Sequence, residues 1–363
     1  MNSLRVLHVA DVHLGAKFKG LPPNKARNRR EDLKNTFGKI IALAKSSKST
    51  AILIAGDLFD NPNPNSSLVS FVTNEMEKAE IPIFLTPGNH DSIIKGSVYS
   101  ENNFPSNVVI FNPEFSCKTI GDLAVHGVAY DPNKPEKHIL KDLTEPLPDK
   151  FNVALVHGSY NFMDFGDENY YPIAKEEIER SGMDYIALGH FHTFSNLKTS
   201  VPACYPGTPE GLGFKDIGDR DVLLIDFNQN GAKIEPININ SKKYEMYELD
   251  CSDLINELEI KNKISECADP NKLLRVNMFG VPQALIELDT DALLEEIENS
   301  FFHLELIDNI HSPTEIQADN TIKGAFINKI QEKIGRTAEP EEKKLLERAL
   351  KLGLLALEGE ENR

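Results

Sequence analysis

The chain has 363 residues, a hydrophobic fraction of 40% and a mean hydropathy of -0.33. This length suits two or three domains with a sizeable core, and no apolar run reaches the ~18 residues that a membrane span needs. The formal net charge of -17 argues against a simple nucleic-acid-binding module.

Five short apolar segments predict buried strands. In chain order they are LRVLHVA, TAILIAG, IPIFLTP, FNVALVH and MDYIALG. Helical patterns over residues 30–45, 67–79 and 173–181 separate several of them. Strands that alternate with helices predict a layered α/β core with a parallel or mixed sheet. Ligands bind beyond the carboxyl ends of such strands, so we expect residues that follow the five segments to converge on one edge of the sheet.

Each of these strands leads into a short motif that contains metal-ligand residue types. The motifs DVH, GD, GNHD, HG and GHFH supply Asp11, His13, Asp57, Asn89, His90, Asp91, His157, His190 and His192. Oxygen and nitrogen ligands without a thiolate suit manganese, iron or zinc better than a soft copper site. Two metals held ~3.5–4 Å apart can clamp the attacking and leaving oxygens of a phosphate ester. The motifs therefore predict a phosphoesterase with two metals.

The predicted roles follow from the order of the motifs. Asp57 is the bridging carboxylate. The other ligands form two sets, with Asp11, His13 and His192 around one metal and Asn89, His157 and His190 around the other. His90, with its neighbour Asp91, is predicted to be the general acid for the leaving oxygen. His8 and His126 lie inside strand-like segments, so we expect them to be structural.

These motifs resemble the calcineurin-like metallophosphoesterase superfamily and, within it, the DNA-repair nuclease family of SbcD and YhaO-like exonuclease type. The resemblance rests on DVHLG (11–15), GDLFD (56–60), PGNHD (87–91), ALGHFH (187–192) and YPGTPEGLGF (205–214), of which the last is the least generic. It covers residues 5–215. It implies a layered metallophosphoesterase β-sandwich flanked by helices, with two divalent ions, most often Mn²⁺.

The resemblance also implies hydrolysis of DNA phosphodiesters in double-strand break repair, commonly as 3′-to-5′ exonuclease and single-strand endonuclease. The implied partners are DNA and an SbcC-type ABC ATPase with a long coiled coil, and a homodimer is left open. Two positions depart from relatives. Asp60 stands where many archaeal and eukaryotic members have a second active-site histidine, and Val12 stands where relatives often have tryptophan. Neither change removes a ligand.

Positive charge is concentrated near the first motif. Residues 1–50 contain 11 Lys and Arg against 3 Asp and Glu, a balance of +8, whereas the remaining residues carry -25. We expect a DNA-contacting group that could neutralise phosphates beside the metals, formed by Lys17, Lys19, Lys25, Arg27, Arg29 and Arg30. The alternative is a solvated loop and helix start.

Three domains are expected. Residues 1–240 form the nuclease domain, which closes with a hairpin over 222–228 and 232–239 and a turn at Asn230 and Gly231. Residues 241–315 alternate strands and helices, with a helix over 252–267 capped by Asp250 or Ser252, and form a small α/β cap. The cap either positions DNA or serves stability or dimerisation. Residues 316–363 form two amphipathic helices, over 321–335 and 340–357, that dock to the ATPase or pack on the chain itself.

The cellular location is predicted from the N-terminus and the cysteines. The first residues run directly into the first strand without a charged region and a long apolar region, so we expect no signal peptide. Cys117, Cys204, Cys251 and Cys267 lie far apart and show no zinc spacing. We therefore expect reduced thiols and a cytoplasmic protein that does not contact membranes.

Two other functional classes stay open. A small-molecule phosphodiesterase or phosphatase could use the same dinuclear site, although a minimal phosphatase needs neither the cap nor the leucine-rich tail. A non-catalytic scaffold could keep the fold, although such proteins usually lose ligands and every ligand position here is filled.

Overall fold

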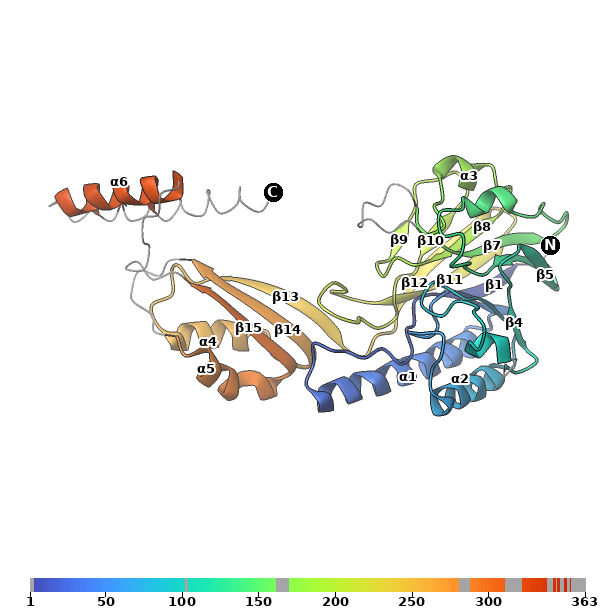
Figure 1. The fold of residues 1–363 in the computed structure, drawn as a ribbon, viewed down its shortest axis with the longest axis horizontal. Coiled ribbons are helices and arrows are strands. Elements are labelled where there is room, and N and C mark those ends of the chain that lie inside the picture. The colour runs from blue at the N-terminus through green and yellow to red at the C-terminus, as the bar shows by residue number, and fades with distance from the viewer. Residues whose placement is uncertain are drawn as a thin grey trace. The chain divides into compact units, whose positions relative to one another are not determined.

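The computed structural model describes residues 3–101, 104–160, 170–280, 288–310 and 322–337, together with seven positions between 342 and 353. The chain divides into two compact units, Met1–Tyr244 and Glu245–Arg363, whose elements are labelled in Figure 1. Among these described residues, no helix combines the length and the apolar character needed to cross a membrane.

The first sheet of the N-terminal unit has the strand order β12-β11-β1-β2-β3-β4. Neighbouring strands from β1 to β4 are parallel, whereas β11 is antiparallel to both β1 and β12. The bounds are β1 Leu4–Val9, β2 Ala51–Ala55, β3 Ile83–Thr86, β4 Val108–Ile110, β11 Asp221–Asn228 and β12 Gly231–Asn238. Three motif-bearing strands, β1, β2 and β3, therefore end at the same edge of this sheet.

The second sheet has the order β5-β6-β7-β8-β10-β9. Its four central strands are parallel, and β5 and β9 are antiparallel at the two edges. The bounds are β5 Ser116–Ile120, β6 Leu123–Val128, β7 Phe151–His157, β8 Tyr185–Gly189, β9 Ser195–Asn196 and β10 Ala203–Tyr205. The remaining motif-bearing strands, β7 and β8, lie side by side in the middle of this sheet.

The two sheets pack face to face and form the predicted β-sandwich. Side chains alternate across a strand, so Val6 and Leu53 of the first sheet share a buried cluster with Val153 and Tyr185 of the second. The neighbouring residues Leu7 and Ile52 point the other way, into the cluster beneath the helices. The layered α/β fold is confirmed. The five motifs come from two stacked sheets, so the residues that follow them meet at an edge that both sheets share.

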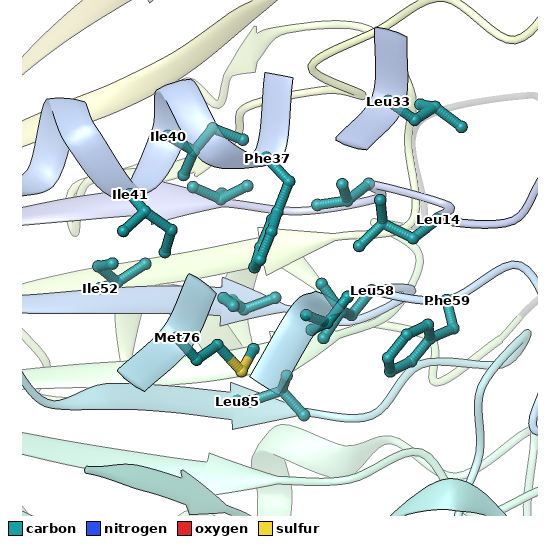
Figure 2. Packing of buried hydrophobic residues seen from close by; sticks show 14 of the residues in the cluster. Leu14, Leu33, Phe37, Ile40, Ile41, Ile52, Leu58, Phe59, Met76 and Leu85 are labelled. Carbon is teal, nitrogen blue, oxygen red and sulfur yellow. The ribbon is translucent and has the colours of Figure 1, made fainter. Parts of the chain in front are cut away.

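Helices α1 (Pro23–Ser46) and α2 (Ser66–Ala79) cover the outer face of the first sheet (Figure 1). Figure 2 shows Phe37 of α1 and Met76 of α2 in the layer that also contains Ile52 and Leu85. Helix α1 begins at Pro23 rather than at residue 30, because proline fits the first turn of a helix. The outer face of the second sheet carries α3 (Lys175–Glu179) and a third buried cluster.

The hairpin that closes the first sheet forms where it was expected, with one change. Strands β11 and β12 pair from Asp221 with Asn238 to Asn228 with Gly231. Gln229 and Asn230 are therefore the loop residues, one position earlier than predicted. Gly231 opens β12 with a φ of 110°, a conformation that glycine adopts without a steric cost.

The second unit contains a sheet of order β13-β14-β15 with helices on one face. The bounds are β13 Lys243–Asp250, β14 Asp269–Gly280, β15 Phe301–Ile310, α4 Glu257–Ser265 and α5 Thr290–Ile297. Its core includes Leu249, Ile260, Val276, Leu293 and Leu304.

Helix α4 is shorter than the predicted helix over 252–267. Its N-cap is Asn256, whose Oδ1 accepts a hydrogen bond from Glu259 N at 3.0 Å, rather than Asp250 or Ser252. The described residues also include three short 3-10 helices, at Val98–Glu101, Ile139–Asp142 and Glu298–Ser300.

The C-terminal residues contain helix α6 (Ile322–Arg336), as predicted. Most of the second predicted helix, over 340–357, lies outside the described residues. The seven positions described there are helical, and Leu350 packs with Phe326, Ile327, Ile330 and Ile334 of α6.

Candidate metal centre

The predicted ligands follow the carboxyl ends of strands in both sheets, at points where the backbone adopts unusual conformations. Asp11, His13 and Asp57 have φ values of 52°, 49° and 49°, and His190 has a φ of 115°. A positive φ is uncommon outside glycine. Such strained residues persist only where the surrounding structure holds them, and they gather at functional sites.

Backbone hydrogen bonds tie the loops after β1 and β2 together. His13 N donates to Asp57 O at 2.9 Å, and Leu14 N donates to Leu58 O at 2.9 Å. Asp60 N donates in turn to Leu14 O at 3.1 Å. The first two motifs are therefore held in a fixed register beyond the ends of their strands.

Hydrogen bonds to the two aspartates connect further motifs. His190 N, from the second sheet, lies 3.2 and 3.0 Å from the two carboxylate oxygens of Asp11 in the first sheet. His90 N donates to Asp57 Oδ1 at 2.9 Å. Each aspartate thus accepts a backbone N–H group from a different motif, which fixes the direction of its remaining lone pairs.

Two motif glycines allow close approach of the site residues. A Cβ atom at Gly56 would lie 2.0 Å from His157 Nδ1, and one at Gly88 would lie 2.2 Å from Asp57 Oδ1. Neither residue could carry a side chain without displacing a predicted ligand. The glycine in each of the GD and GNHD motifs therefore has a steric reason.

The structure brings all seven predicted ligands together. Three groups have ligand atoms within 4.8 Å of one another, namely Asp11 with His13 and His192, His13 with Asp57 and His90, and Asp11 with Asp57 and His157. Asn89 completes the cluster, because its Oδ1 lies 2.8 Å from His157 Nε2 and 3.2 Å from His190 Nδ1.

The orientation of the histidine rings fits a bound cation. His157 Nδ1 lies 2.9 Å from the carbonyl oxygen of Ala55, so it carries the proton and leaves Nε2 as an acceptor. That Nε2 faces Asn89 Oδ1, which is also an acceptor when the amide has this orientation. Two acceptors at 2.8 Å repel each other unless a cation lies between or beside them. The residue types and the positions of their acceptor atoms therefore both suit a divalent metal at this place.

His13 and His192 show the same arrangement. Their Nε2 atoms lie 3.2 Å apart, and their Nδ1 atoms each lie 3.4 Å from a carboxylate oxygen, of Asp60 and of Asp216 respectively. A carboxylate beside Nδ1 favours the proton there, as it does in carboxylate–histidine–metal arrangements. Both Nε2 lone pairs then point at one position.

Buried charge dominates the electrostatics of the cluster. Asp11 and Asp57 are 0% and 2% exposed. Burial opposes ionisation of Asp57, but the neighbouring His157 and His13 hold the pKa of its carboxyl below the usual value. Burial, together with the nearby His157, lowers the pKa of His190 to about 3. His190 is therefore neutral at pH 7 and has a lone pair for a metal.

His90 lies at the exposed rim of this cluster. Its ring centroid is 4.8 Å from that of His13, and its Nδ1 lies 3.4 Å from the backbone oxygen of Asp60. Because a ring nitrogen of His90 also falls within the group that contains His13 and Asp57, the ring is placed either to donate a proton or to approach a metal.

Asp91 has contacts that differ from its predicted pairing with His90. It is fully buried, and its carboxylate accepts hydrogen bonds from Gly88 N at 2.8 Å, Phe59 N at 3.0 Å and the Tyr99 hydroxyl at 2.6 Å. Burial, with the nearby charge of Asp57, raises its pKa to about 6. Among the described residues these contacts connect Asp91 to the loop backbone rather than to the His90 ring.

The comparisons with known proteins agree with this geometry. A family model described as calcineurin-like phosphoesterase matches residues 4–194, which is more than half of the chain. The chain belongs to the calcineurin-like phosphoesterase family. It therefore has the metallophosphoesterase fold and the metal-dependent hydrolase character that the motifs predicted.

Several curated relatives of this phosphoesterase carry informative names. The chain is 28% identical over 238 residues to the "uncharacterized metallophosphoesterase YhaO" of Bacillus subtilis, covering 62% of this chain and 58% of YhaO. It is 27% identical over 288 residues to the "DNA double-strand break repair protein Mre11" of Sulfurisphaera tokodaii, covering 75% of this chain and 71% of that protein. The Mre11 protein of Methanopyrus kandleri is 25% identical over 332 residues, covering 81% and 67%. The match to YhaO thus spans less than two thirds of that protein.

The predicted basic group is only partly available to a ligand in this calcineurin-like phosphoesterase. Lys17, Lys19 and Arg27 are exposed, and Lys25 and Arg30 are partly buried. Arg29 does not belong to the group. Its side chain is 0% exposed and forms ion pairs with Asp32 at 2.9 Å and Glu210 at 2.8 Å.

The error at Arg29 has a physical cause. On α1 this position faces inward between Ala26 and Leu33, which are also buried. A run of positive charge in the sequence does not distinguish a solvated arginine from one that is neutralised by a distant carboxylate.

Sequence reasoning missed Asp60 and Asp216 as neighbours of the ligand histidines. Asp60 was noted only as a departure from relatives. Asp216 lies two residues after the end of the segment YPGTPEGLGF, which the sequence marked as unusual without giving it a role.

Proposed function

We propose that this chain is a manganese-dependent DNA nuclease that hydrolyses phosphodiester bonds at a dinuclear metal site. The observation that supports the proposal most strongly is the convergence of Asp11, Asp57 and four histidine rings at the shared edge of two sheets. Asp57 Oδ2 lies 3.7 Å from His13 Nε2 and 3.5 Å from His157 Nε2. It is therefore the bridging ligand between two metal positions.

We assign the residues to the two positions as the motif order suggests. Asp11, His13 and His192 would hold one ion, and Asn89, His157 and His190 would hold the other, with Asp57 shared. When bound, two such ions supply Lewis acidity and a water of lowered pKa for attack on phosphorus. The buried carboxylates and the histidine rings of the chain would fix the ions and exclude bulk water from one side of the site.

His90 is the proton donor in this proposal. Its ring is exposed at the rim, so a leaving oxygen can approach it, and its Nδ1 faces the carbonyl oxygen of Asp60. In the imidazolium form, Nδ1–H donates to that carbonyl oxygen and Nε2–H faces the substrate, where it gives its proton to the leaving oxygen and keeps the N–H electron pair. Asp91 acts as a positioning residue, because it fixes the backbone of Gly88 and Phe59 on either side of the site.

DNA is the favoured substrate for two reasons. Two relatives with the name "DNA double-strand break repair protein Mre11" align with 75% and 81% of this chain. The exposed Lys17 and Lys19 lie in the loop after the first ligand motif, and the exposed Arg27 lies near the start of α1. Positive charge at these positions can neutralise a phosphate backbone. Exonuclease action from 3′ to 5′, endonuclease action on single strands and a role in double-strand break repair belong to the same proposal.

Further assignments concern the second unit and the partners. We propose that the unit after Tyr244 includes a cap that positions DNA, and that α6 and the helical residues after it bind an SbcC-type ABC ATPase. Ile322 and Leu345 are 82% and 66% exposed, which supplies apolar surface for a partner coiled coil. Dimerisation and a cytoplasmic location remain part of the proposal, and the four free cysteines fit a reducing compartment.

The deciding experiment is degradation of end-labelled linear duplex and single-stranded DNA by the purified full chain with Mn²⁺, with Mg²⁺ or with EDTA. An Asp57→Ala variant, which lacks the shared ligand, is run in parallel. Cleavage that requires Mn²⁺ and is absent from the variant supports the nuclease. Rapid hydrolysis of a small phosphodiester with no cleavage of DNA under any metal favours the alternative, a small-molecule phosphodiesterase or phosphatase.

A further inference from the structure

The segment after the last ligand makes three separate contacts with His192. Thr208 N donates to the backbone oxygen of His192 at 3.1 Å, and Arg220 Nη1 donates to the same oxygen at 2.8 Å. Asp216 Oδ1 lies 3.4 Å from His192 Nδ1. The backbone and the ring of this histidine are therefore both held by residues 208–220.

Asp216 is itself held in a single orientation. It is 6% exposed, and its second carboxylate oxygen accepts a hydrogen bond from Leu212 N at 2.9 Å. Its own backbone N donates to Gly213 O at 2.9 Å. With one oxygen committed to Leu212, the other is left for the imidazole of His192.

The same segment is anchored to the rest of the unit through Glu210, which is fully buried. Its Oε2 accepts from Arg29 at 2.8 Å, and its Oε1 accepts from Thr36 at 2.8 Å and from the Ser241 hydroxyl at 2.7 Å. Arg29 also donates to the backbone oxygen of Gly211 at 3.0 Å. Helix α1 thus fixes the loop from which Asp216 reaches His192.

We propose that Asp216 is a positioning residue that holds His192 with its proton on Nδ1 and its Nε2 lone pair directed at the metal position shared with His13. This inference rests on the proposed metal site and deepens it. The 3.2 Å separation of the His13 and His192 Nε2 atoms shows where that lone pair points. A ring with the opposite tautomer would present an N–H group there and could not bind a metal through Nε2.

The carboxylate is specifically required, because asparagine would reverse the hydrogen-bond polarity. Leu212 N is a fixed donor, so the amide oxygen of an Asp216→Asn variant would pair with it. The amide NH₂ group would then face His192 Nδ1 and favour the tautomer that is protonated on Nε2. Alanine would remove both groups and let water accept the Nδ1 proton. The nearly isosteric asparagine should therefore harm the site more than the smaller alanine does.

The test is Mn²⁺ binding to the full chain, measured by calorimetric titration after EDTA treatment. In the Asp216→Asn variant we expect one of two sites to weaken by about 10–100-fold, the range for lost outer-shell partners, with the other site unchanged. Asp216→Ala should weaken the same site less. Asp219→Asn is the matched control. It removes the same negative charge three positions along the chain from Asp216, and the Asp219 side chain is 67% exposed. It should bind both ions as the unaltered chain does.

A second measurement does not depend on metal. Nitrogen chemical shifts of ¹⁵N-histidine-labelled, metal-free protein report which ring nitrogen is protonated, and a His192→Gln variant assigns the signal. We expect Nδ1–H in the unaltered chain and a shift toward Nε2–H in Asp216→Asn.

The outcomes separate this proposal from the proposed function. An unchanged tautomer in Asp216→Asn overturns the positioning role, and so does a larger loss of metal affinity with alanine than with asparagine. If the unaltered chain bound no Mn²⁺, the proposed function would fail, while the tautomer measurement would still decide the role of Asp216. Thermal unfolding in EDTA shows whether each variant is folded.

Discussion

The Nε2 atoms of His13 and His192 lie 3.2 Å apart, although 179 positions separate the two residues in the sequence. One follows β1 of the first sheet and the other follows β8 of the second. The cluster therefore depends on the stacking of two sheets, and its geometry is set by the sandwich core as much as by the motifs.

Asp57→Ala should remove both metals. The carboxylate lies within 3.7 Å of His13 Nε2 and 3.5 Å of His157 Nε2, so both proposed sites lose a ligand at once. Since loss of an outer-shell partner alone costs about 10–100-fold, we expect hydrolysis to fall further than that. Metal content per chain is measured after equilibrium dialysis against Mn²⁺, with Asp219→Ala as the control. Two ions retained per chain would refute the bridging role.

His90→Asn should keep both metals and slow the release of poor leaving groups. General acid catalysis typically contributes about 10²–10⁴-fold, so DNA cleavage should fall by that order. A p-nitrophenyl phosphodiester, whose leaving group needs no proton, should be affected much less. Rates on the two substrates and metal content are measured together. Equal loss on both substrates, with a lost ion, would instead make His90 a metal ligand, which its position near His13 and Asp57 permits.

Replacing Arg29 with alanine should lower stability, whereas replacing Arg27 with alanine should weaken DNA binding, although the two residues lie only two positions apart on α1. Arg29 is fully buried against Glu210 and Asp32, so its loss leaves buried carboxylate unpaired and should lower the free energy of unfolding by about 3–5 kcal/mol. Arg27 is exposed, so its loss should leave the free energy of unfolding unchanged. It should weaken DNA binding and lower the slope of log affinity against log salt concentration by about 1, the value for one phosphate contact. Urea unfolding and DNA titrations at several salt concentrations test both. A stable Arg29→Ala variant with weakened DNA binding would restore the original assignment.

His8 should make the protein less stable as the pH falls below about 6.5. Burial lowers the pKa of His8 to about 3 in the folded protein, whereas an unfolded histidine titrates near 6.5. As the pH falls, His8 is protonated first in the unfolded state. Proton binding therefore favours the unfolded state more and more as the pH falls from about 6.5 toward 3. The expected loss in unfolding free energy between pH 7 and pH 5 is about 2 kcal/mol.

The comparison that isolates this effect is His8→Gln, whose amide can still reach the Tyr185 hydroxyl that lies 2.9 Å from His8 Nδ1. Urea unfolding of both metal-free proteins at pH 7, 6 and 5 gives the difference. Parallel pH profiles for the two proteins would show that His8 is not the source of the loss.

The residues that gather in the candidate metal cluster could be predicted from the sequence, because each motif is local. An apolar segment that ends in Asp11, Asp57 or His157 gives both the strand and the residue at its end, and buried parallel strands produce near-continuous apolar runs. The division of those strands between two sheets could not be predicted in this way. Strand β7 is as apolar as β2, and the sequence around each strand does not indicate which strand it pairs with.

The residues that support the ligands were not predictable for a related reason. Arg29 contacts Glu210 across 181 positions, and Asp216 approaches a ring on a different loop. The adjacency of His90 and Asp91 in the chain suggested a catalytic pair, yet adjacent residues in a turn point in different directions, and Asp91 faces Tyr99 and the backbone instead. Motif spacing therefore indicates the candidate ligands better than it indicates the residues that orient them.

The position of β11 has a consequence for the protein during synthesis. Strand β1, which leads into the first motif, lies between β2 and β11, and β11 begins only at Asp221. A growing chain therefore exposes one hydrogen-bonding edge of β1 until more than 200 further residues have been added, which takes on the order of 10–40 s at typical translation rates. We expect a chaperone to shield that edge in the interval, because an unpaired strand edge invites aggregation.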